Sequence, residues 1–413
     1  MKYATTIIIG AGQAGLAMSK HLADRSVDHV LLERGHVANS WATERWDSLR
    51  LLTPNWQSRL PGFRYAGDDP DGFMDMPEVT KYLTTYAAHI SAPVQTDTTV
   101  TSVRSAEGGY IVSTNRETWA CAKIVLANGA CNVAQRPKIA DDFPSTITQL
   151  TPLDYKSTNQ LPDGGVLVVG ASATGVQLAR EIQASGRNVT LAVGEHIRVP
   201  RRFRGRDIKW WMEVTGLLDI GLKDVDDIAR ARKLPSLQLA GSPDNAMLDL
   251  NALAARDVEV VGRLAGLHNG RVQFSGSLAN TCSLADLKMN RLLVGIDQWV
   301  EEKGSSNHYA PSHRFAPTNI STTPRLDMNL TDGSVKTVIW ATGFRPDYSW
   351  LHVPVLDRKG RIRHDGGVVA APGMYVLGLP FLRKRKSTLI DGVGADAEHL
   401  ANHLSASLEQ KAA

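Results

Sequence analysis

ATTIIIGAGQAGLAMSKHLADR, residues 4–25, carries the clearest structural signal in the sequence. A β-branched run leads into the glycine-rich segment 10–15, and apolar residues at helical spacing follow, so the order is strand, tight turn and helix. A second apolar run, HVLLE, ends at Glu33, 23 positions after Gly10. That spacing is close to the roughly 20 positions between such a turn and the ribose-binding acid of a dinucleotide fold. An isolated GxGxxG can be a flexible turn, but this combination predicts a dinucleotide-binding unit.

Each residue of this turn has a physical task. Gly10 permits the sharp exit from the strand, Gly12 lets the backbone approach a pyrophosphate, and Gly15 lets helix and strand pack closely. The helix N-terminus then faces the phosphates and stabilises their charge. Glu33 can accept hydrogen bonds from ribose hydroxyls.

The pattern recurs at LPDGGVLVVGASATGVQLAREI, residues 161–182. Ser172 replaces the middle glycine, but serine is small and its hydroxyl can bond a phosphate. The next strand, NVTLAV, lacks the expected acid in its last positions, and arginines follow it. An acid would repel a 2′-phosphate whereas arginine offers it a donor fork, so NADPH is favoured over NADH. A solvated loop, or a patch for an acidic partner, is the alternative for this cluster. The cluster consists of Arg198, Arg201, Arg202, Arg204 and Arg206.

Length and composition exclude several classes of function. At 413 residues the chain is long enough for two substantial domains. Its 46 basic and 42 acidic residues give no broad charged surface for nucleic acid or an anionic membrane, and the basic run 383–386 is typical of a solvated loop. The three cysteines have neither CxxC nor metal-ligand spacing, so no metal site is predicted. Without a signal peptide or a membrane-spanning run, a cytoplasmic protein is expected.

Further strands are predicted between and after the two turns. VIWATGFRPDYSWL, residues 338–351, is an apolar strand that runs into Ala-Thr-Gly, and ANG at 127–129 looks like its counterpart. GMYVLGLPFL, residues 373–382, predicts another buried strand, and a helix should begin near Gly392. The strands expected to complete the first domain's sheet lie at 98–103, 110–114 and 123–129.

An ordered set of motifs over almost the whole chain resembles the flavin-containing monooxygenase family, especially its short bacterial branch and the related indole-pyruvate monooxygenases. The motifs are GAGQAG, SW with RWDSLRLLTP at 40–54, FMDMPEVTKYLTTYA at 73–87, GASATG, PRRFRGRDIKWW at 200–211, ATGFRPDYSWL at 341–351 and STLIDGVG at 387–394.

The resemblance implies an α/β fold with two Rossmann-like dinucleotide-binding domains. An FAD domain made of residues 1–158 and 281–413 would hold an inserted NADP domain, residues 159–280. In such enzymes NADPH reduces FAD, and reduced flavin reacts with O2 to give a C4a-(hydro)peroxide. A small organic substrate of nitrogen, sulfur or keto-acid type then takes one oxygen atom. A homodimer is a further expectation.

Site residues are carried over on the matching motifs. Thr53 and Asn55 match a segment that passes beside the flavin ring, where they are candidates to hydrogen-bond the flavin or its peroxide, although an ordinary turn around Pro54 is an equal alternative. A helix starting near Gly392 would direct its positive dipole end at the flavin. The residues expected to bind the cofactors are Gly10, Gly12, Gln13, Ala14, Gly15, Glu33, Arg34, Ser40, Trp41, Val100, Ala127, Gly129, Gly170, Ser172, Thr174, Gly175, Arg198, Arg201, Ala341, Thr342, Gly343, Leu389 and Gly392.

One departure from the family pattern leaves alternatives open. The identifying motif has a histidine four residues before an aromatic residue, and here Thr151 stands four residues before Tyr155. An NADPH oxidase that is not coupled to oxygenation, or a flavin-binding redox sensor, would also fit. A pyridine nucleotide-disulfide reductase needs a redox-active cysteine pair, which this sequence lacks.

Overall fold

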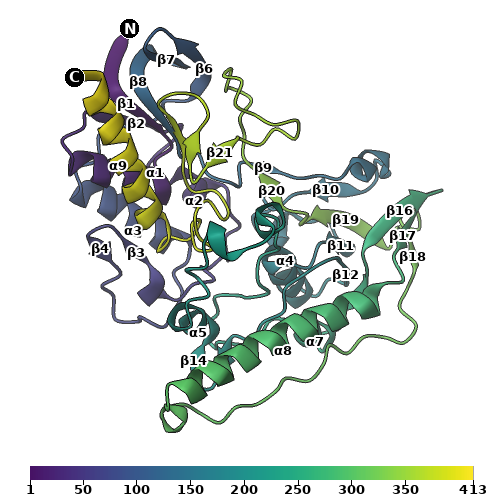
Figure 1. The fold of residues 1–413 in the computed structure, drawn as a ribbon. Coiled ribbons are helices and arrows are strands. Elements are labelled where there is room, and N and C mark those ends of the chain that lie inside the picture. The colour runs from purple at the N-terminus through teal and green to yellow at the C-terminus, as the bar shows by residue number, and fades with distance from the viewer. Residues whose placement is uncertain (413) are drawn as a thin grey trace.

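Two sheets organise the computed structural model, which describes residues 1–412, and they form the centres of two lobes (Figure 1). The first sheet has the order β21-β22-β23-β8-β1-β2-β5, and β1 runs parallel to both β2 and β8. Strands β6 and β7 extend β8 by antiparallel pairing. The strands are β1 (Lys2–Ile9), β2 (His29–Leu32), β5 (Val94–Gln95), β6 (Val100–Ala106), β7 (Gly109–Thr114), β8 (Thr118–Leu126), β21 (His364–Asp365), β22 (Val368–Val369) and β23 (Met374–Val376).

Helices from both chain ends cover this sheet. Helix α1 (Gln13–Ala23) contacts α9 (Val393–Ala412) and α3 (Met76–His89), and the N- and C-termini lie in the same lobe (Figure 1). The start of helix α3 is fixed by its own residues. Asp75 and Glu78 form a capping box, and a proline lies in the first turn. The short α2 (Asn39–Thr43) packs near α3. The predicted strands at 98–103, 110–114, 123–129 and 373–382 are confirmed in this sheet.

The second sheet has the order β10-β19-β11-β12-β15, and every neighbouring pair is parallel. Its central strands are buried along their whole length, as expected for a parallel sheet covered on both faces. Helix α4 (Ala173–Ala184) packs on β11 and β12, and α7 (Leu250–Ala254) packs on α4. The strands are β10 (Thr148–Leu150), β11 (Gly165–Val169), β12 (Val189–Val193), β15 (Glu259–Gly262) and β19 (Val335–Trp340).

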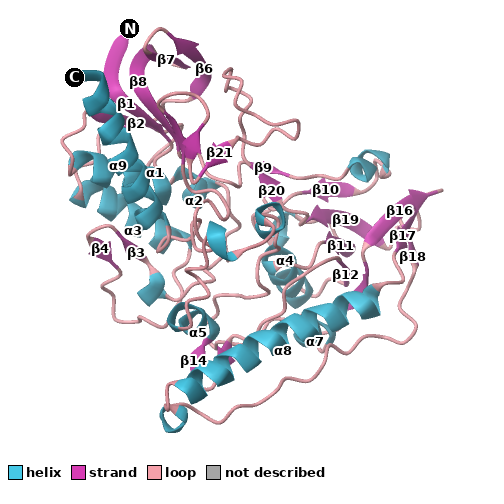
Figure 2. Cartoon of the chain, in the orientation of Figure 1, coloured by secondary structure: helices cyan, strands magenta, loops and turns pink. Residues whose placement is uncertain are grey.

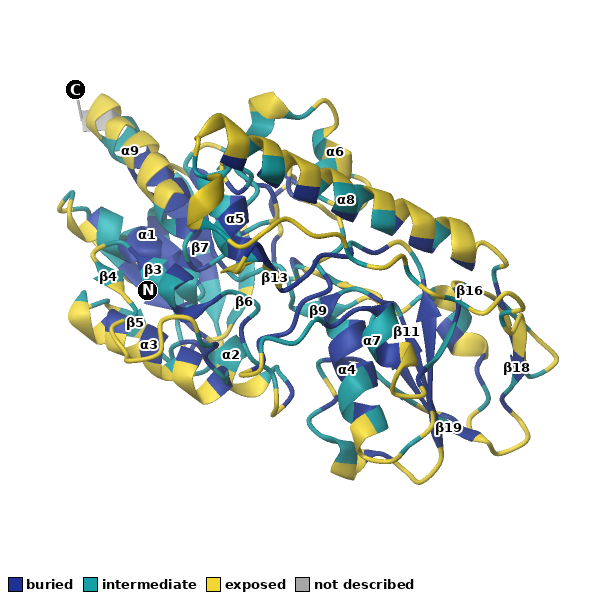
Figure 3. Cartoon of the chain, turned by 90° about the horizontal axis from the view of Figure 1, so that it is seen from below, coloured by how far each residue is buried: buried dark blue, intermediate teal, exposed yellow. Residues whose placement is uncertain are grey.

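A long helix, α8 (Leu278–Glu302), runs along the second lobe, and its outer face is exposed while the inner face is buried (Figure 3). Its inner residues pack with α5 (Ile208–Val214) around Trp211. A three-stranded antiparallel sheet borders the main one (Figure 2). The remaining elements are β3 (Arg59–Leu60), β4 (Phe63–Arg64), β13 (Arg202–Phe203), β14 (Arg206–Asp207), α6 (Ile228–Ala231), β16 (Leu264–His268), β17 (Arg271–Phe274) and β18 (Asp327–Asn329).

The chain passes between the lobes twice, and the two connections pair with each other. Strand β9 (Val133–Ala134) on the way out is antiparallel to β20 (Phe344–Arg345) on the way back. The predicted domain boundaries assigned β10 and β19 to the first domain, yet both strands hydrogen bond within the second sheet. We therefore propose boundaries near residues 134 and 344. Among the described residues, no helix has the length and apolar character needed to cross a bilayer.

Candidate cofactor sites

The first glycine turn is packed against a carbonyl on one side and open on the other. Gly10 has φ +104°, and a Cβ there would lie 2.6 Å from the carbonyl oxygen of Ala127. A Cβ on Gly15 would lie 1.9 Å from the oxygen of Gly10. A Cβ on Gly12, by contrast, would meet no atom within 4 Å. The turn thus requires glycine for packing at two positions and leaves open space at the third, at the start of α1.

Glu33 lies at the end of β2 with its carboxylate against this turn. The side chain is 8% exposed, and it accepts hydrogen bonds from the backbone N–H of Ala11 at 2.7 Å and of Gly35 at 3.3 Å. These contacts fix the carboxylate beside the glycine turn, which is the place of the ribose acid in dinucleotide folds. Val100 begins the strand that follows Thr98, whose N–H donates to the carbonyl of Glu33 at 2.8 Å.

The residues predicted around the first turn lie together. Trp41 donates from Nε1 to the Gln13 side chain at 3.0 Å, which ties α2 to the start of α1. Arg34 donates to the Ser40 hydroxyl at 3.3 Å and pairs with Glu44. Ala14 is buried in the first turn of α1.

The second glycine turn repeats this geometry. Gly170 has φ +108°, and a Cβ there would lie 2.3 Å from the carbonyl oxygen of Ala341. A Cβ on Gly175 would lie 1.8 Å from the oxygen of Gly170. The predicted correspondence between the Ala-Asn-Gly and Ala-Thr-Gly segments is therefore confirmed, since each contributes an alanine carbonyl that packs against a turn glycine.

The two units also share one register. Thr6 pairs with His29 in the first unit, and the residues numbered 160 higher, Val166 and Val189, pair in the second. By the same offset Ser172 takes the place of Gly12, and its hydroxyl makes no cap hydrogen bond. Val193 takes the place of Glu33, so no acid occupies the ribose position of the second unit.

The remaining predicted residues flank these turns. Thr174 lies half-buried in the first turn of α4. A Cβ on Gly129 would meet no atom within 4 Å. A Cβ on Gly343 would have the Gln135 Nε2 as its nearest neighbour, at 3.9 Å. The Thr342 hydroxyl donates to the carbonyl of Gln135.

The side chain of Asn55 makes two hydrogen bonds within its own lobe. Its Nδ2 donates to the carbonyl of Asp69 at 2.9 Å, and its Oδ1 accepts from the N–H of Met74 at 2.8 Å. The amide therefore holds the 69–74 loop, and the role of Asn55 beside the flavin stays a prediction. Thr53 is half-buried, and its hydroxyl has no hydrogen-bond partner among residues 1–412.

Gln57 is the unpaired amide of this segment. Both its Nε2 and Oε1 are buried without a partner in the described part of the chain. A buried amide that lacks partners costs free energy unless a ligand or water satisfies it. Nothing in the sequence distinguished this residue. Contacts made only in the folded protein decide which amide side chains hydrogen bond to the loop and which stay unpaired.

The assignment of Arg198 and Arg201 is corrected. Arg198 is 3% exposed, and it bonds Asp249 through Nε at 2.9 Å and Asp286 through Nη1 at 2.7 Å. Arg201 is 1% exposed, with Nε 2.7 Å from Asp207 and the guanidinium 4.6 Å from the Phe73 ring centroid. Since carboxylates already occupy both guanidinium groups in the interior, neither is placed to bind a nucleotide phosphate.

A group of charged residues surrounds the loop that precedes α9. Leu389 and Gly392 lie in this loop, and a Cβ on Gly392 would lie 1.7 Å from the oxygen of Lys386. Arg59 joins the loop to α5, because it bonds Asp391 at 2.7 Å and Glu213 at 2.6 Å.

Lys209 on α5 lies in the same charged group and is 6% exposed. Burial, together with the charge of Arg201, lowers the pKa of Lys209 to about 8, although Asp207, Asp391 and Glu213 oppose the shift. No hydrogen bond or ion pair holds its ammonium group among residues 1–412. It is therefore an interior cation that lacks a direct partner.

Thr151 and Tyr155, at the motif that lacks a histidine, have local structural contacts. The Thr151 hydroxyl donates to Asp154 at 2.7 Å. Tyr155 is buried and donates to Glu181 at 2.7 Å, and Ser48 donates to the same carboxylate. Glu181 thus joins the segment before β11 to a loop of the first lobe.

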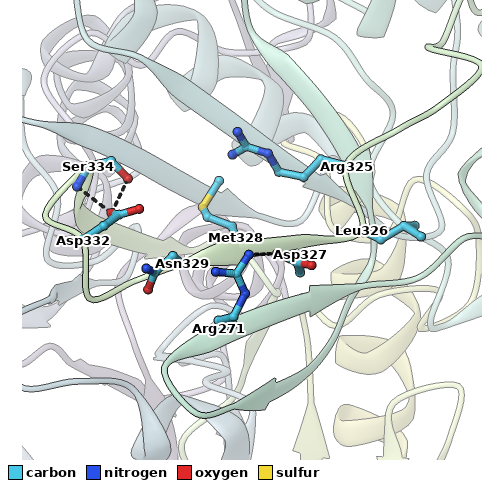
Figure 4. Close-up of a pocket in the computed structure, with 8 residues that line it drawn as sticks. All are labelled: Arg271, Arg325, Leu326, Asp327, Met328, Asn329, Asp332 and Ser334. Atoms are coloured by element: carbon cyan, nitrogen blue, oxygen red, sulfur yellow. Dashed lines mark hydrogen bonds and ion pairs between the residues drawn. The ribbon is translucent and has the colours of Figure 1, made fainter.

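Two surface hollows lie away from both glycine turns. One, of about 400 Å³, lies on the small sheet of β16, β17 and β18, where Arg271 and Asp327 pair across it (Figure 4). Another, of about 820 Å³, lies beside β21, β22 and α9, with His364, His399 and Arg383 in its lining. Neither contains a glycine turn.

The comparisons with known proteins agree with this geometry. A family model described as pyridine nucleotide-disulphide oxidoreductase matches residues 7–212. A CzcO-like oxidoreductase of Geobacillus kaustophilus is 30% identical over 410 residues, covering 96% of this chain and 97% of that protein. The chain belongs to the CzcO-like oxidoreductases.

Relatives and structures from outside the CzcO-like proteins extend the match. A probable indole-3-pyruvate monooxygenase of Arabidopsis thaliana, YUCCA3, is 29% identical over 219 residues, which is 48% of either chain. The structure of a flavin-containing monooxygenase from Stenotrophomonas maltophilia aligns with a TM-score of 0.68 and 19% identity, over 99% of this chain and all of that one. The predicted oxidoreductase class and the fold with two dinucleotide-binding units are confirmed.

Proposed function

We propose that this CzcO-like protein is an FAD- and NADPH-dependent monooxygenase that transfers one oxygen atom from O2 to a small organic substrate. The observation that carries the proposal is the pair of glycine turns in one register, of which the first retains the ribose acid Glu33 and the second has Val193 instead. The two nucleotide-binding units thus differ at the ribose position. This difference suits FAD in the first unit and a phosphorylated nicotinamide dinucleotide, which reduces the flavin, in the second.

The residues present fit FAD at the first turn. The open space at Gly12 admits the pyrophosphate, the α1 N-terminus faces it, and Glu33 is held where a ribose would bind. The half-buried hydroxyl of Thr53, which has no hydrogen-bond partner in the described part of the chain, would contact the flavin ring. When bound, the flavin supplies the electron transfer and oxygen activation, and the protein's task is placement and water exclusion.

The second turn fits NADPH in the same way. Ser172 offers a free hydroxyl at the place of Gly12, and the α4 N-terminus offers its dipole to the phosphates. Val193 at the ribose position leaves room for a 2′-phosphate, which a glutamate at that position would repel.

Disulfide reduction, which the family model's description includes, lacks its chemical group here. Cys121 and Cys282 are buried, and desolvation raises their pKa values to about 12 and about 11. Thiols that stay protonated at neutral pH are poor nucleophiles, and the third cysteine, Cys131, also has a pKa raised by burial.

An NADPH oxidase is the second candidate, and Thr151 is the observation that favours it. The position that holds the family's histidine carries a hydroxyl that is bonded to Asp154 within its own turn. A side chain held in this way makes no contact that would retain an oxidised nucleotide. For either activity, a cytoplasmic homodimer acting on a nitrogen, sulfur or keto-acid compound is part of the proposal.

Rapid-mixing absorbance spectroscopy tests the function. The purified protein is reduced with NADPH without oxygen and then mixed with oxygenated buffer. A transient absorbance distinct from both oxidised and reduced flavin supports a monooxygenase, and its faster decay with a compound identifies a substrate. Direct return to oxidised flavin with release of hydrogen peroxide supports the oxidase, and a failure of NADPH to reduce the flavin overturns both.

A further inference from the structure

Arg263 lies at the edge of the second sheet where a dinucleotide would bind. Strands β12 and β15 are parallel neighbours, with Val193 paired to Gly262. The next residues along each strand, Gly194 and Arg263, therefore lie side by side at the carboxyl edge, which is the ligand edge of such sheets. The Cγ and Cδ of Arg263 are 3.8 Å from the point where Gly194 would carry a Cβ. Its side chain thus covers the end of β12.

The arginines that follow β12 in sequence are engaged elsewhere. Arg198 and Arg201 are buried against carboxylates, and Arg204 bonds Asp297 at 2.7 Å. Arg202 is exposed and donates to the carbonyl of Gly205 at 2.7 Å, and the Arg206 guanidinium lies 5.4 Å from the Trp210 ring centroid. Each of the five has a structural partner.

Arg263 is free by comparison. It is exposed, and no hydrogen bond or ion pair of its guanidinium occurs among residues 1–412. Glu195, the first acid in the sequence after β12, pairs with Lys288 at 3.2 Å, so its charge is partly offset. The surroundings therefore do not compete for the guanidinium of Arg263.

The position also suits the length of the ligand. Neighbouring strands lie about 4.8 Å apart, so β15 is about 10 Å from the glycine turn that follows β11. A ribose carried by a pyrophosphate at that turn would lie over the end of β12, beside Val193. Its 2′ substituent would then point toward the side chain that covers Gly194.

We propose that Arg263 binds the 2′-phosphate of NADPH and thereby selects NADPH over NADH. The inference rests on the proposed function for the identity of the nucleotide. It differs from the sequence prediction in taking the arginine from the third strand of the unit, β15, rather than from the loop after the second, β12.

Calorimetric binding of adenosine 2′,5′-bisphosphate and of 5′-AMP tests this without turnover. The Arg263→Gln variant should bind the bisphosphate roughly 10- to 100-fold more weakly, as expected for loss of charge-assisted hydrogen bonds. Its affinity for 5′-AMP should be unchanged, and Arg263→Lys should be intermediate because it keeps the charge without the planar fork.

Arg202→Gln is the matched control, since it removes an exposed arginine from the cluster after β12, and it should leave both affinities unchanged. Unchanged bisphosphate binding in Arg263→Gln, an equal loss for both ligands, or a wild-type protein that does not prefer the bisphosphate would each overturn the assignment. A protein that binds the bisphosphate through Arg263 but never oxidises NADPH would refute the proposed function and leave this inference standing.

Discussion

Gly12 and Gly15 lie three positions apart in one turn, and they should fail for different reasons when replaced. Gly12→Val introduces a side chain into space where no protein atom lies within 4 Å, at an extended backbone position that valine adopts readily. We expect a folded, colourless protein without FAD, because the side chain fills the pyrophosphate's place. Gly15→Ala instead forces a Cβ onto the oxygen of Gly10 and should lower the free energy of unfolding by roughly 1–3 kcal/mol.

Flavin absorbance and urea unfolding distinguish the two variants. Yellow protein from Gly12→Val would contradict the assignment of the pyrophosphate to this turn. A Gly15→Ala variant as stable as the wild type would show that α1 can move away from β1.

Lys209 should leave a signature in the pH dependence of stability. The unfolded lysine holds its proton up to about pH 10.5, whereas the folded one releases it near the lowered pKa of about 8. Between these values the unfolded state binds more protons, so this group makes stability rise with pH. Lys209→Met should lack that rise, on the order of 2 kcal/mol between pH 7.5 and 9.5.

Urea unfolding at the two pH values measures the effect. Lys384→Met is the control, because Lys384 is a partly exposed lysine paired with Asp219. An equal pH dependence in the wild type and in Lys209→Met would show that Lys209 is solvated or paired in solution.

At the scale of residues, the sequence predicted the positions that the backbone itself requires. Gly10, Gly15 and Glu33 follow from the geometry of one local turn, and the structure places them as expected. Asn55 and Arg198 were not predictable in this way, because their roles depend on Met74 and Asp249, which come from distant parts of the chain. A sequence shows which side chains carry charge but not which carboxylates they meet.

At the scale of elements, Arg198 holds three segments together. Asp249 caps α7 by accepting from the N–H of Ala252 at 2.9 Å, and Asp286 belongs to α8. Arg198 also donates to the carbonyl of Ala316 at 2.9 Å. Arg198→Ala would leave the buried Asp249 and the partly buried Asp286 without their cation, and it should cost roughly 3–5 kcal/mol of stability.

Chemical unfolding measures this loss, with Arg202→Ala expected to stay within about 0.5 kcal/mol of the wild type. The ratio of NADPH to NADH affinity should not change in Arg198→Ala. A stable variant that loses its preference for NADPH would restore the role that the sequence suggested for this residue.

The strand at the start of the run 338–351 was predictable as an element, but the sheet that it joins was not. The run at 338–351 is apolar and β-branched, and it forms β19 as expected. It was assigned to the first domain because it follows residue 280, yet it pairs with β11 and β10 in the second sheet. Both sheets have parallel, buried cores, so an apolar run fits either one by composition alone.

At the scale of the whole molecule, the lobes have separate cores. One apolar cluster contains β1, α1 and α9, and others contain β11, α4 and β19. We expect two unfolding transitions, of which added NADP+ shifts only that of the second lobe, by about 2.7 kcal/mol at a concentration 100 times its dissociation constant. Tryptophan fluorescence combined with flavin release during urea unfolding separates the two. One shared transition, moved as a whole by NADP+, would mean that the lobes unfold together.

The paired connections β9 and β20 have a mechanical consequence. Because the two strands hydrogen bond to each other, one lobe cannot slide past the other without breaking that pair. Any rotation between the lobes would have to bend both connections together, so we expect the pair to act as their common hinge. Each connection starts shortly after an alanine, Ala127 or Ala341, whose carbonyl packs against a glycine turn. The two glycine turns are therefore attached to the same strand pair from opposite sides, so any bending of that pair would change how the two turns lie relative to each other.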